Sequence, residues 1–212
     1  MKKALKIAVI VVAIAAMVVA FAACGGKKAE TTAIKFGTNA EFPPFEFIAS
    51  EGVIDTYDGI DMAIAKAIGE KTGKEAKIEN MEFDSLLIAL QNGQIDATIS
   101  GMTITEERKK SVDFSNPYYT ATQVMIVPED STIASAQDMQ DKIIAVVQGY
   151  TGETCVTELG YEHESFKKGT ECIMELVNGK CDVVVIDSAT AKKYVGDNEG
   201  LTIVEDASAF EA

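Results

Sequence analysis

The chain contains few of the residue types that metal and redox sites require. Its 212 residues include one histidine, four cysteines and no tryptophan. The histidine, His163, has no acidic or cysteine partner at a metal-ligand interval, and no two cysteines have a C-x-x-C spacing. The sequence therefore predicts no metal and no cofactor. Cys155, Cys172 and Cys181 fall in apolar patterns and are interpreted first as small buried hydrophobes, although one disulfide among them is also allowed.

Positive charge is scarce as well. The chain carries 19 lysines and arginines against 33 aspartates and glutamates, which gives a formal net charge of −14 at pH 7. Such a balance repels phosphate backbones and anionic membrane surfaces. The composition therefore argues against nucleic acid as a partner.

Arg108 is the only arginine in the chain, and the other basic residues are lysines. A planar guanidinium can hold a carboxylate through two parallel hydrogen bonds, which a lysine cannot do. One interpretation is that Arg108 binds the carboxylate of a ligand. The other is a solvated surface arginine paired with Glu106 or Glu107. In either case Thr105 is placed to cap the short helix that contains Arg108.

Residues 1–24 have the pattern of an export signal. Three lysines precede an uninterrupted apolar run at 7–23, which is shorter than the roughly 20 residues that a spanning helix needs. The run ends in Phe-Ala-Ala-Cys, which resembles a bacterial lipoprotein cleavage box and makes Cys24 the expected lipidation site. An uncleaved signal anchor is the alternative, and both place the rest of the chain outside the cytoplasm. Residues 25–32 are predicted to be a soluble tether.

From residue 33 onward, strand and helix patterns alternate. Strands are predicted at 33–39, 76–80 and 95–100. One helix begins near residue 60 and ends at Gly73, and a second, capped by Asp84 or Ser85, ends at Asn92-Gly93. This order implies a parallel sheet with right-handed crossovers.

Residues 122–128 form a β-rich segment with no helix before it, so we interpret them as a connector. The alternation then restarts with a short helix from Ser135, and the remaining pattern predicts strands at 143–147, 164–166, 182–186 and 201–204 separated by helices at 151–159, 170–177 and 188–195. The sequence therefore predicts lobe 1 over 33–121, a hinge strand over 122–128 and lobe 2 over 129–212.

A local repeat supports two lobes of one design. Leu-x-Asn-Gly-x-x-Asp occurs at 90–96, before the strand that ends at Ser100, and again at 176–182, before the strand that ends at Asp187. In both places a helix is expected to stop at Asn-Gly, and a buried strand then carries a polar residue to its carboxyl end. Ligands of open α/β sheets bind at such ends.

Two sheets that face each other through these ends would bring Arg108 and Thr103 of one lobe opposite Asp187 and Thr151 of the other. Such a site would suit a zwitterion, because the guanidinium would bind its carboxylate and the aspartate its ammonium. Asp187 could equally cap the helix that follows it, and the two threonines could be ordinary turn residues.

Several motifs together resemble one protein family. They are TNAEFPPFEF, DGIDMAIAKAIGEKTG, MEFDSLLIALQNGQIDATISGMTITEERKKSVDFSNPYY, QGYTGE and DVVVIDS. The chain looks like an extracytoplasmic solute-binding protein of an ABC importer, of the polar amino-acid class called family 3. The resemblance implies a two-lobed, periplasmic-binding-protein-like α/β fold, with each lobe a mostly parallel sheet flanked by helices. It also implies a monomer that closes on an amino acid and delivers it to an ABC permease, anchored to the cell membrane by its N-terminal lipid only.

The resemblance also implies roles for individual residues. Arg108 would bind the α-carboxylate, helped by the Thr103 N–H and the region of Thr151, whereas Asp187, the Gly101 carbonyl and the Thr103 hydroxyl would take the α-ammonium. The ligand side chain would lie between Phe42 and Phe83, in a pocket shaped by Asn39, Ser100 and Ile186. The match weakens at residues 147–150, where relatives more often carry a polar residue and a threonine or serine.

Other expectations concern the end of the chain and the function class. Relatives continue past residue 212 with a second hinge strand and terminal helices, so we expect a C-terminally truncated chain. The alternatives are an enzyme on the same fold, similar to a cyclohexadienyl dehydratase, and a ligand-sensing ectodomain. The sequence shows no catalytic triad that would favour the enzyme. Asn39, Ser100 and the two phenylalanines suit polar and aromatic ligands alike.

Overall fold

The structure, a computed structural model, describes residues 32–210. The predicted signal peptide, the expected lipidation site Cys24 and residues 25–31 of the predicted tether lie outside this range. Within it, none of the helices has both the length and the apolar composition of a membrane-spanning segment.

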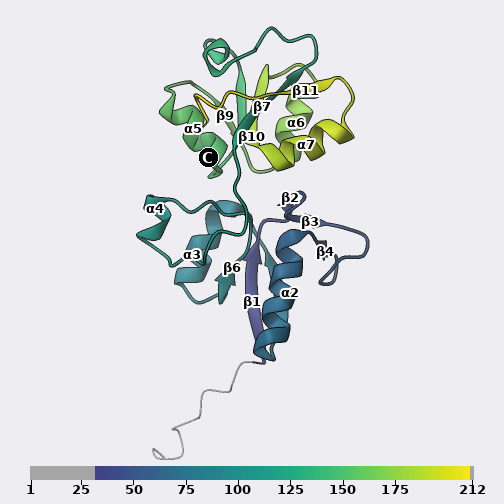
Figure 1. The fold of residues 1–212 in the computed structure, drawn as a ribbon, viewed down its shortest axis with the longest axis vertical. Helices are drawn as coiled ribbons and strands as arrows, with labels where there is room; N and C mark the ends of the chain where they lie inside the picture. The colour runs from purple at the N-terminus through teal and green to yellow at the C-terminus, as the bar shows by residue number, and fades with distance from the viewer. Residues whose placement is uncertain (1–31, 211–212) are drawn as a thin grey trace, which may run out of the picture. The chain divides into compact units, whose positions relative to one another are not determined.

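The first sheet is parallel, as the alternating pattern predicts. Its strands are β1 (Ala33–Thr38), β5 (Glu75–Asn80) and β6 (Ala97–Thr98), in the order β5-β1-β6. Helix α2 (Ile60–Thr72) ends at Gly73 in the left-handed conformation, as predicted. The sequence pattern places Ile60 and Ile68 on its buried face, but both are exposed, and the helix buries Asp61, Met62, Ala65 and Gly69 instead. We call this sheet, with the helices that pack on it, lobe 1 (Figure 1).

Three details of lobe 1 differ from the sequence interpretation. The strand predicted at 95–100 is only two residues long. The 3-10 helix η1 (Phe83–Ser85) precedes α3 (Leu86–Gln91), and Ser85, one of the two predicted caps, is the N-cap residue of α3 but makes no capping hydrogen bond with its side chain. The segment after β1 forms a small antiparallel sheet of β2 (Glu41–Phe42), β3 (Glu46–Ile48) and β4 (Tyr57–Asp58).

The second sheet has five strands in the order β11-β7-β10-β8-β9, and we call it and its helices lobe 2. Strands β8 (Ile144–Val147), β9 (Glu164–Phe166) and β10 (Val183–Asp187) are parallel, whereas β7 (Gln123–Pro128) is antiparallel to β10 and to β11 (Leu201–Val204). The β7 segment, predicted as a connecting hinge strand, is a strand, and it lies inside this sheet. Its first five residues are all buried, which only a central strand achieves.

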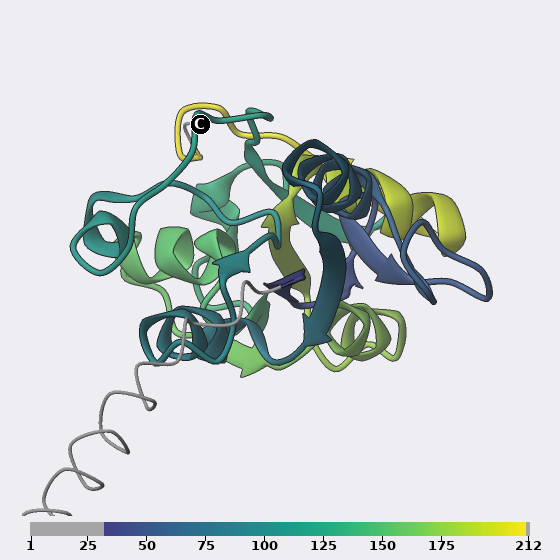
Figure 2. The same cartoon turned by 90° about the horizontal axis from the view of Figure 1, so that it is seen from below.

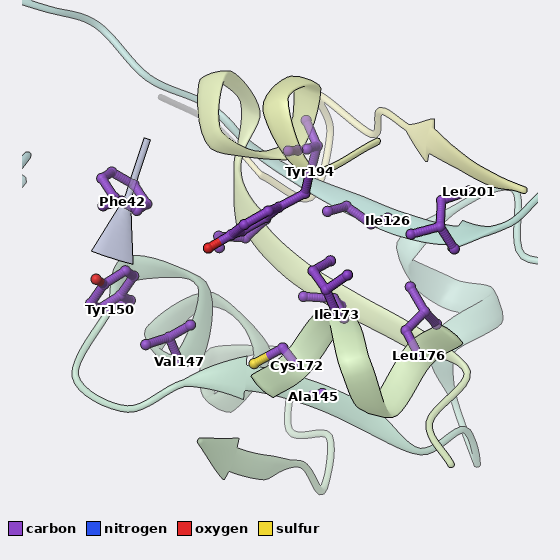
Figure 3. Close-up of a cluster of buried hydrophobic side chains, with 14 of the residues drawn as sticks. Phe42, Ile126, Ala145, Val147, Tyr150, Cys172, Ile173, Leu176, Tyr194 and Leu201 are labelled. Carbon is purple, nitrogen blue, oxygen red and sulfur yellow. The ribbon is translucent and has the colours of Figure 1, made fainter. Parts of the chain in front are cut away.

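Helices cover both faces of the five-stranded sheet. Val124 and Ile126 pack with α6 (Gly169–Val177) and α7 (Ser188–Asp197) in one cluster of buried side chains, part of which Figure 3 shows. Met125 and Val127 pack in a second cluster with α5 (Thr151–Glu158) and the short helix η2 (Ala136–Met139). In Figure 2 the green helix α5 lies on one side of this sheet and the yellow-green helices α6 and α7 on the other. Burial on both faces explains the uninterrupted apolar runs of these strands.

The three cysteines of the described residues are free thiols. Cys172 and Cys181 are buried, and burial raises the pKa of each to about 12. They are therefore small core hydrophobes, as the sequence suggests, and the allowed disulfide is not formed. Cys155 is half-buried against the second cluster.

The repeated Leu-x-Asn-Gly-x-x-Asp motif has the same conformation in both lobes. Gly93 and Gly179 both have φ 68°, so each helix ends in a left-handed glycine. Asp96 and Asp182 then bind the beginning of a neighbouring strand in the same way. Oδ2 of Asp96 accepts from Lys35 N–H at 2.9 Å, and Oδ2 of Asp182 accepts from Ile143 N–H at 2.8 Å. The motif thus fixes where a helix stops and where the next strand joins its sheet.

Replacing Gly93 or Gly179 with alanine should destabilise the protein by roughly 1–2 kcal/mol, the cost of the left-handed conformation for a residue with a Cβ. No atom lies within 4 Å of a Cβ added at either position, so the loss would report backbone strain alone. Urea denaturation of each variant measures it.

Gly196→Ala is the matched control, because Gly196 lies within α7, a Cβ there also meets no atom within 4 Å, and its φ is not positive. We expect this variant to be unchanged or stabilised by up to about 1 kcal/mol. Equal losses at all three glycines would contradict the assignment of strain to the two motifs.

Candidate functional site

A cavity of about 20 Å³ lies where the carboxyl ends of strands from both lobes meet. Eight of the nine residues predicted to bind a ligand line it, namely Phe42, Phe83, Ser100, Gly101, Thr103, Arg108, Thr151 and Asp187. The ninth, Asn39, is buried behind the lining. Gln123 and Tyr150 also line the cavity and were not predicted. Ile186 is not part of the lining.

Arg108 is held in place by the start of α4 (Glu106–Lys109). The Thr105 side chain caps this helix by accepting from Arg108 N–H at 3.1 Å, as predicted. The guanidinium donates to the carbonyl oxygens of Thr103 at 2.8 Å and Gly149 at 2.9 Å. Its Cζ lies 5.3 Å from the centre of the Phe83 ring. The site thus positions the guanidinium from three directions.

The alternative of a surface arginine paired with a neighbouring glutamate is wrong. Glu106 binds Lys109 at 2.7 Å and Glu107 binds Lys110. Within residues 32–210, no carboxylate lies within ion-pair distance of Arg108. Burial lowers the pKa of Arg108, yet a guanidinium remains charged in a protein. The cavity therefore presents a partly desolvated cation without a counter-ion, which favours an anionic ligand group.

Asp187 ends β10 and lies in the same lining with only 7% of its surface exposed. Its Oδ1 accepts from Ala189 N–H at 3.0 Å, so it caps α7, as one of the two interpretations predicts. Burial raises the pKa of this carboxyl group. No lysine or arginine of the described residues pairs with it. A cap of this kind leaves the residue at the cavity wall, so capping and ligand binding are compatible.

The two predicted threonines meet across the cavity. Thr151 donates its hydroxyl to the Thr103 hydroxyl at 2.9 Å, which joins lobe 2 to lobe 1. Gly101 approaches Phe42 closely, since a Cβ at Gly101 would lie 2.9 Å from the phenylalanine ring. Only glycine fits at that position without moving the ring.

Two buried acids that sequence reasoning missed support the cavity from behind. Glu46 and Asp61 are both 0% exposed. Ser100 donates to Glu46 Oε1 at 2.9 Å, and Asp61 Oδ2 accepts from Gly101 N–H at 2.8 Å. The acids thus hold two consecutive residues of the lining. The signal that could have revealed them is a single acid inside an apolar stretch, in PFEFI and in GIDMAI.

The surroundings of Glu46 favour its uncharged form. Burial and the Asp61 carboxylate raise its pKa well above the ordinary value of 4.5. Burial raises the pKa of Asp61 too, but hydrogen bonds from the Gly101 N–H and the Tyr118 hydroxyl lower it. The pKa of Asp61 is raised overall, but these hydrogen bonds from Gly101 and Tyr118 favour the charged form. Among the described residues, Oε2 of Glu46 has no hydrogen-bond partner.

Tyr150 is the residue that most changes the predicted site. It follows Gly149 at the start of α5, and its hydroxyl donates to Asn39 Oδ1 at 2.7 Å. Its ring packs edge-on against both Phe42, with ring centres 5.2 Å apart, and Phe83, at 4.6 Å. Figure 3 shows Tyr150 beside Phe42 at the rim of the lobe 2 cluster. The expected weakening of the family resemblance over residues 147–150 includes this position, which was the available signal.

Polar contacts at the edge of the site also join the two lobes. Lys167 pairs with Asp84 at 2.9 Å and Lys168 with Glu41 at 3.0 Å. The Tyr194 hydroxyl donates to the Glu41 carbonyl at 3.1 Å.

Among residues 32–210, no group of three or more histidine, cysteine, aspartate or glutamate side chains is arranged to hold a metal ion. The geometry therefore offers a cation, an anion and hydroxyl groups to a small polar ligand.

Comparison with known proteins decides the family. A model of bacterial extracellular solute-binding proteins, family 3, matches residues 34–195. The chain belongs to this family. The chain is 34% identical over 203 residues to the arginine-binding extracellular protein ArtP of Bacillus subtilis, covering 91% of this chain and 78% of that protein. It is 36% identical over 202 residues to a probable histidine-binding protein of Neisseria gonorrhoeae, covering 89% of this chain and 74% of that protein.

A solved structure agrees with the family assignment. The arginine-bound form of truncated ArgBP from T. maritima matches with a TM-score of 0.77 and 42% identity, over 82% of each chain. The predicted α/β fold of periplasmic binding proteins is therefore confirmed. The chain is a solute-binding protein of the amino-acid ABC-transport class rather than an enzyme. The expected absence of a second hinge strand and of terminal helices stays a prediction, as do the lobe boundaries and the ligand-binding role of each residue.

Stability should depend on pH through Glu46. Because its folded-state pKa lies above the ordinary value of 4.5, its stabilising contribution is complete below that pH and is lost as pH rises through the folded-state pKa. Glu46→Gln cannot ionise, so the variant should gain stability relative to the unmodified protein as pH rises. Urea denaturation from about pH 5 to about pH 8 measures the difference in the free energy of unfolding.

Glu51→Gln serves as the control, because Glu51 is exposed. It should change the pH dependence of unfolding very little. If the free-energy difference between Glu46→Gln and the unmodified protein stayed constant over this pH range, Glu46 would not be held neutral by its surroundings.

Proposed function

We propose that the chain binds a free α-amino acid outside the cytoplasmic membrane, closes its two lobes around it and delivers it to the permease of an ABC importer. The observation that carries the proposal is the Arg108 guanidinium, which is partly buried, has no carboxylate partner within residues 32–210 and shares one cavity with Asp187. A zwitterion supplies both missing counter-ions at once.

The proposed roles follow from charge. Arg108 binds the α-carboxylate, with the Thr103 N–H and the Thr151 hydroxyl as further donors. Asp187 binds the α-ammonium, together with the Gly101 carbonyl and the Thr103 hydroxyl. An unpaired buried ion costs several kcal/mol, whereas hydrogen bonds to charged groups contribute about 1.5–3 kcal/mol each. Both charged groups of the ligand, its carboxylate and its ammonium, must therefore be paired when the ligand is buried.

Closure follows from the distribution of these groups between the lobes. Arg108, Gly101 and Thr103 belong to lobe 1, and Asp187 and Thr151 to lobe 2. An open form offers only one half of the contacts, so the ligand favours the closed form through its difference in affinity. The exposed pairs of Lys167 and Lys168 with lobe 1 acids are screened by solvent and add little.

The proposal includes anchoring at the membrane surface. Cys24 is the residue that would be lipidated, and the lipid would be the only part of the chain in the bilayer. Loss of the three lysines that precede the apolar run would bring the formal charge from −14 to about −17. Such a charge keeps the binding domain off an anionic lipid surface. We further propose that the chain acts as a monomer.

The ligand side chain is not fixed by these ionic contacts. The relatives are named for arginine and histidine. These two amino acids, together with small and polar ones, form the first set of ligands to test.

Removing either charge should abolish most binding. Arg108→Met and Asp187→Asn should each lower affinity at least roughly 30-fold, because truncating one partner of a buried charge pair costs about 2–5 kcal/mol. Asparagine also caps helices well, so Asp187→Asn should preserve α7. Titration calorimetry against a panel of amino acids measures affinity, and thermal unfolding shows that the variants fold.

Lys109→Ala is the neighbouring control, since Lys109 is exposed and pairs only with Glu106. It should bind like the unmodified protein. Near-normal affinity in Arg108→Met would overturn the assignment of Arg108 to the ligand carboxylate, and near-normal affinity in Asp187→Asn would overturn the assignment of Asp187 to the ammonium.

A further inference from the structure

We propose that Tyr150 determines which amino acids the site accepts: its ring fills the space between Phe42 and Phe83 and so limits the ligand to the smallest side chains, those of glycine, alanine and serine. The inference rests on the proposed function, because it takes the ligand to be an α-amino acid held by its two charged groups. It adds the side-chain class, which those groups leave open.

The position of Tyr150 is fixed by its surroundings. Its backbone N–H donates to the Val147 carbonyl at 3.1 Å in the turn between β8 and α5. Its side chain is 8% exposed, and the ring makes edge-on contacts with Phe42 and Phe83 of lobe 1. The hydroxyl donates to Asn39, which is itself only 4% exposed. Tyr150 is therefore a packed wall of the cavity and not a loose side chain at its mouth.

The space left by this wall is small. The cavity of about 20 Å³ holds about one water molecule. A ligand with its carboxylate at Arg108 and its ammonium at Asp187 must direct its side chain to the remaining walls, and these are the two phenylalanines and Tyr150. Because even glycine is larger than one water molecule, the lobes must move outward for every amino acid, and the movement is smallest when the side chain is a hydrogen, a methyl or a hydroxymethyl group.

A longer side chain would have to displace the tyrosine ring. Displacement separates both aromatic contacts and removes the hydrogen bond to Asn39, which leaves a buried amide oxygen unpaired. Cores also resist insertion of extra groups into packed space. Arginine and histidine are therefore disfavoured in the unmodified chain.

The same geometry shows what would reverse the preference. Threonine in place of Tyr150 leaves a space bounded by two aromatic rings with the Asn39 amide at its end. Aromatic faces attract a guanidinium or an imidazolium, and the amide oxygen accepts a hydrogen bond from either. Tyr150→Thr should therefore create room for exactly the side chains that the tyrosine excludes, with a favourable lining.

The test is titration calorimetry of the full chain, freed of bound ligand by unfolding and refolding, against glycine, alanine, serine, arginine and histidine. We expect the unmodified protein to bind alanine or serine at least roughly tenfold more tightly than arginine. We expect Tyr150→Thr to bind arginine at least roughly tenfold more tightly than the unmodified protein does.

Two conservative variants separate the ring from its hydroxyl. Tyr150→Phe keeps the ring and loses the hydrogen bond to Asn39, so it should keep the order of preference. Tyr194→Phe is the matched control, because Tyr194 also donates a hydrogen bond from lobe 2 to lobe 1 but does not line the cavity. Tyr194→Phe should also keep the order in which the unmodified protein prefers the five amino acids. If thermal unfolding shows that Tyr150→Thr is not folded, Tyr150→Leu replaces it.

The possible failures are distinguishable. Equal or tighter binding of arginine or histidine than of alanine by the unmodified protein would overturn the size limit and leave the proposed function standing. So would an unchanged arginine affinity in a folded Tyr150→Thr or Tyr150→Leu variant. Absence of binding to all five amino acids in every folded variant and in the unmodified protein would overturn the proposed function, and the inference with it.

Discussion

The arrangement of the site depends on the Arg108 guanidinium, which is held by two backbone carbonyl groups and a phenylalanine ring but by no carboxylate within the described residues. Carbonyl oxygens orient a guanidinium without neutralising it. The charge therefore stays available inside a partly desolvated cavity, where an anion gains most from meeting it. Asp187, at the end of a strand in the other lobe, supplies the opposite charge.

The same local motif occurs in both lobes and positions the strands that end at the cavity. In each lobe an Asn-Gly step ends a helix, and an aspartate three residues after the glycine binds the beginning of a neighbouring strand. The strand that follows then runs through the sheet and ends at the cavity, at Ser100 in lobe 1 and at Asp187 in lobe 2. Hydrogen bonds made where each strand begins therefore determine which residue lies at its carboxyl end, beside the cavity.

Two buried carboxyl groups lie behind the cavity and support the lobe 1 residues that line it. Glu46 and Asp61 hold Ser100 and Gly101 through hydrogen bonds. Burial and the nearby Asp61 carboxylate raise the pKa of Glu46, which lessens the repulsion between two adjacent buried carboxyl groups. The result is a rigid lobe 1 wall, against which Tyr150 of lobe 2 closes. The width of the cavity is therefore set by packing between the lobes rather than by the charged groups themselves.

The sequence by itself determined the order of helices and strands, the Thr105 cap, the two Asn-Gly helix ends and the family, because each depends on residues close together in the chain or on motifs of fixed spacing. The sequence also predicted a strand at β7, but not its central place in a sheet, which depends on strands some 60 and 75 residues later in the chain. Only the tertiary structure decided that Arg108 has no carboxylate partner among the described residues, that Glu46 and Asp61 lie together in a buried position, and that the Tyr150 ring contacts both Phe42 and Phe83. These properties depend on contacts between segments that are far apart in the sequence and bury one another. A local sequence pattern does not show which segments come into contact.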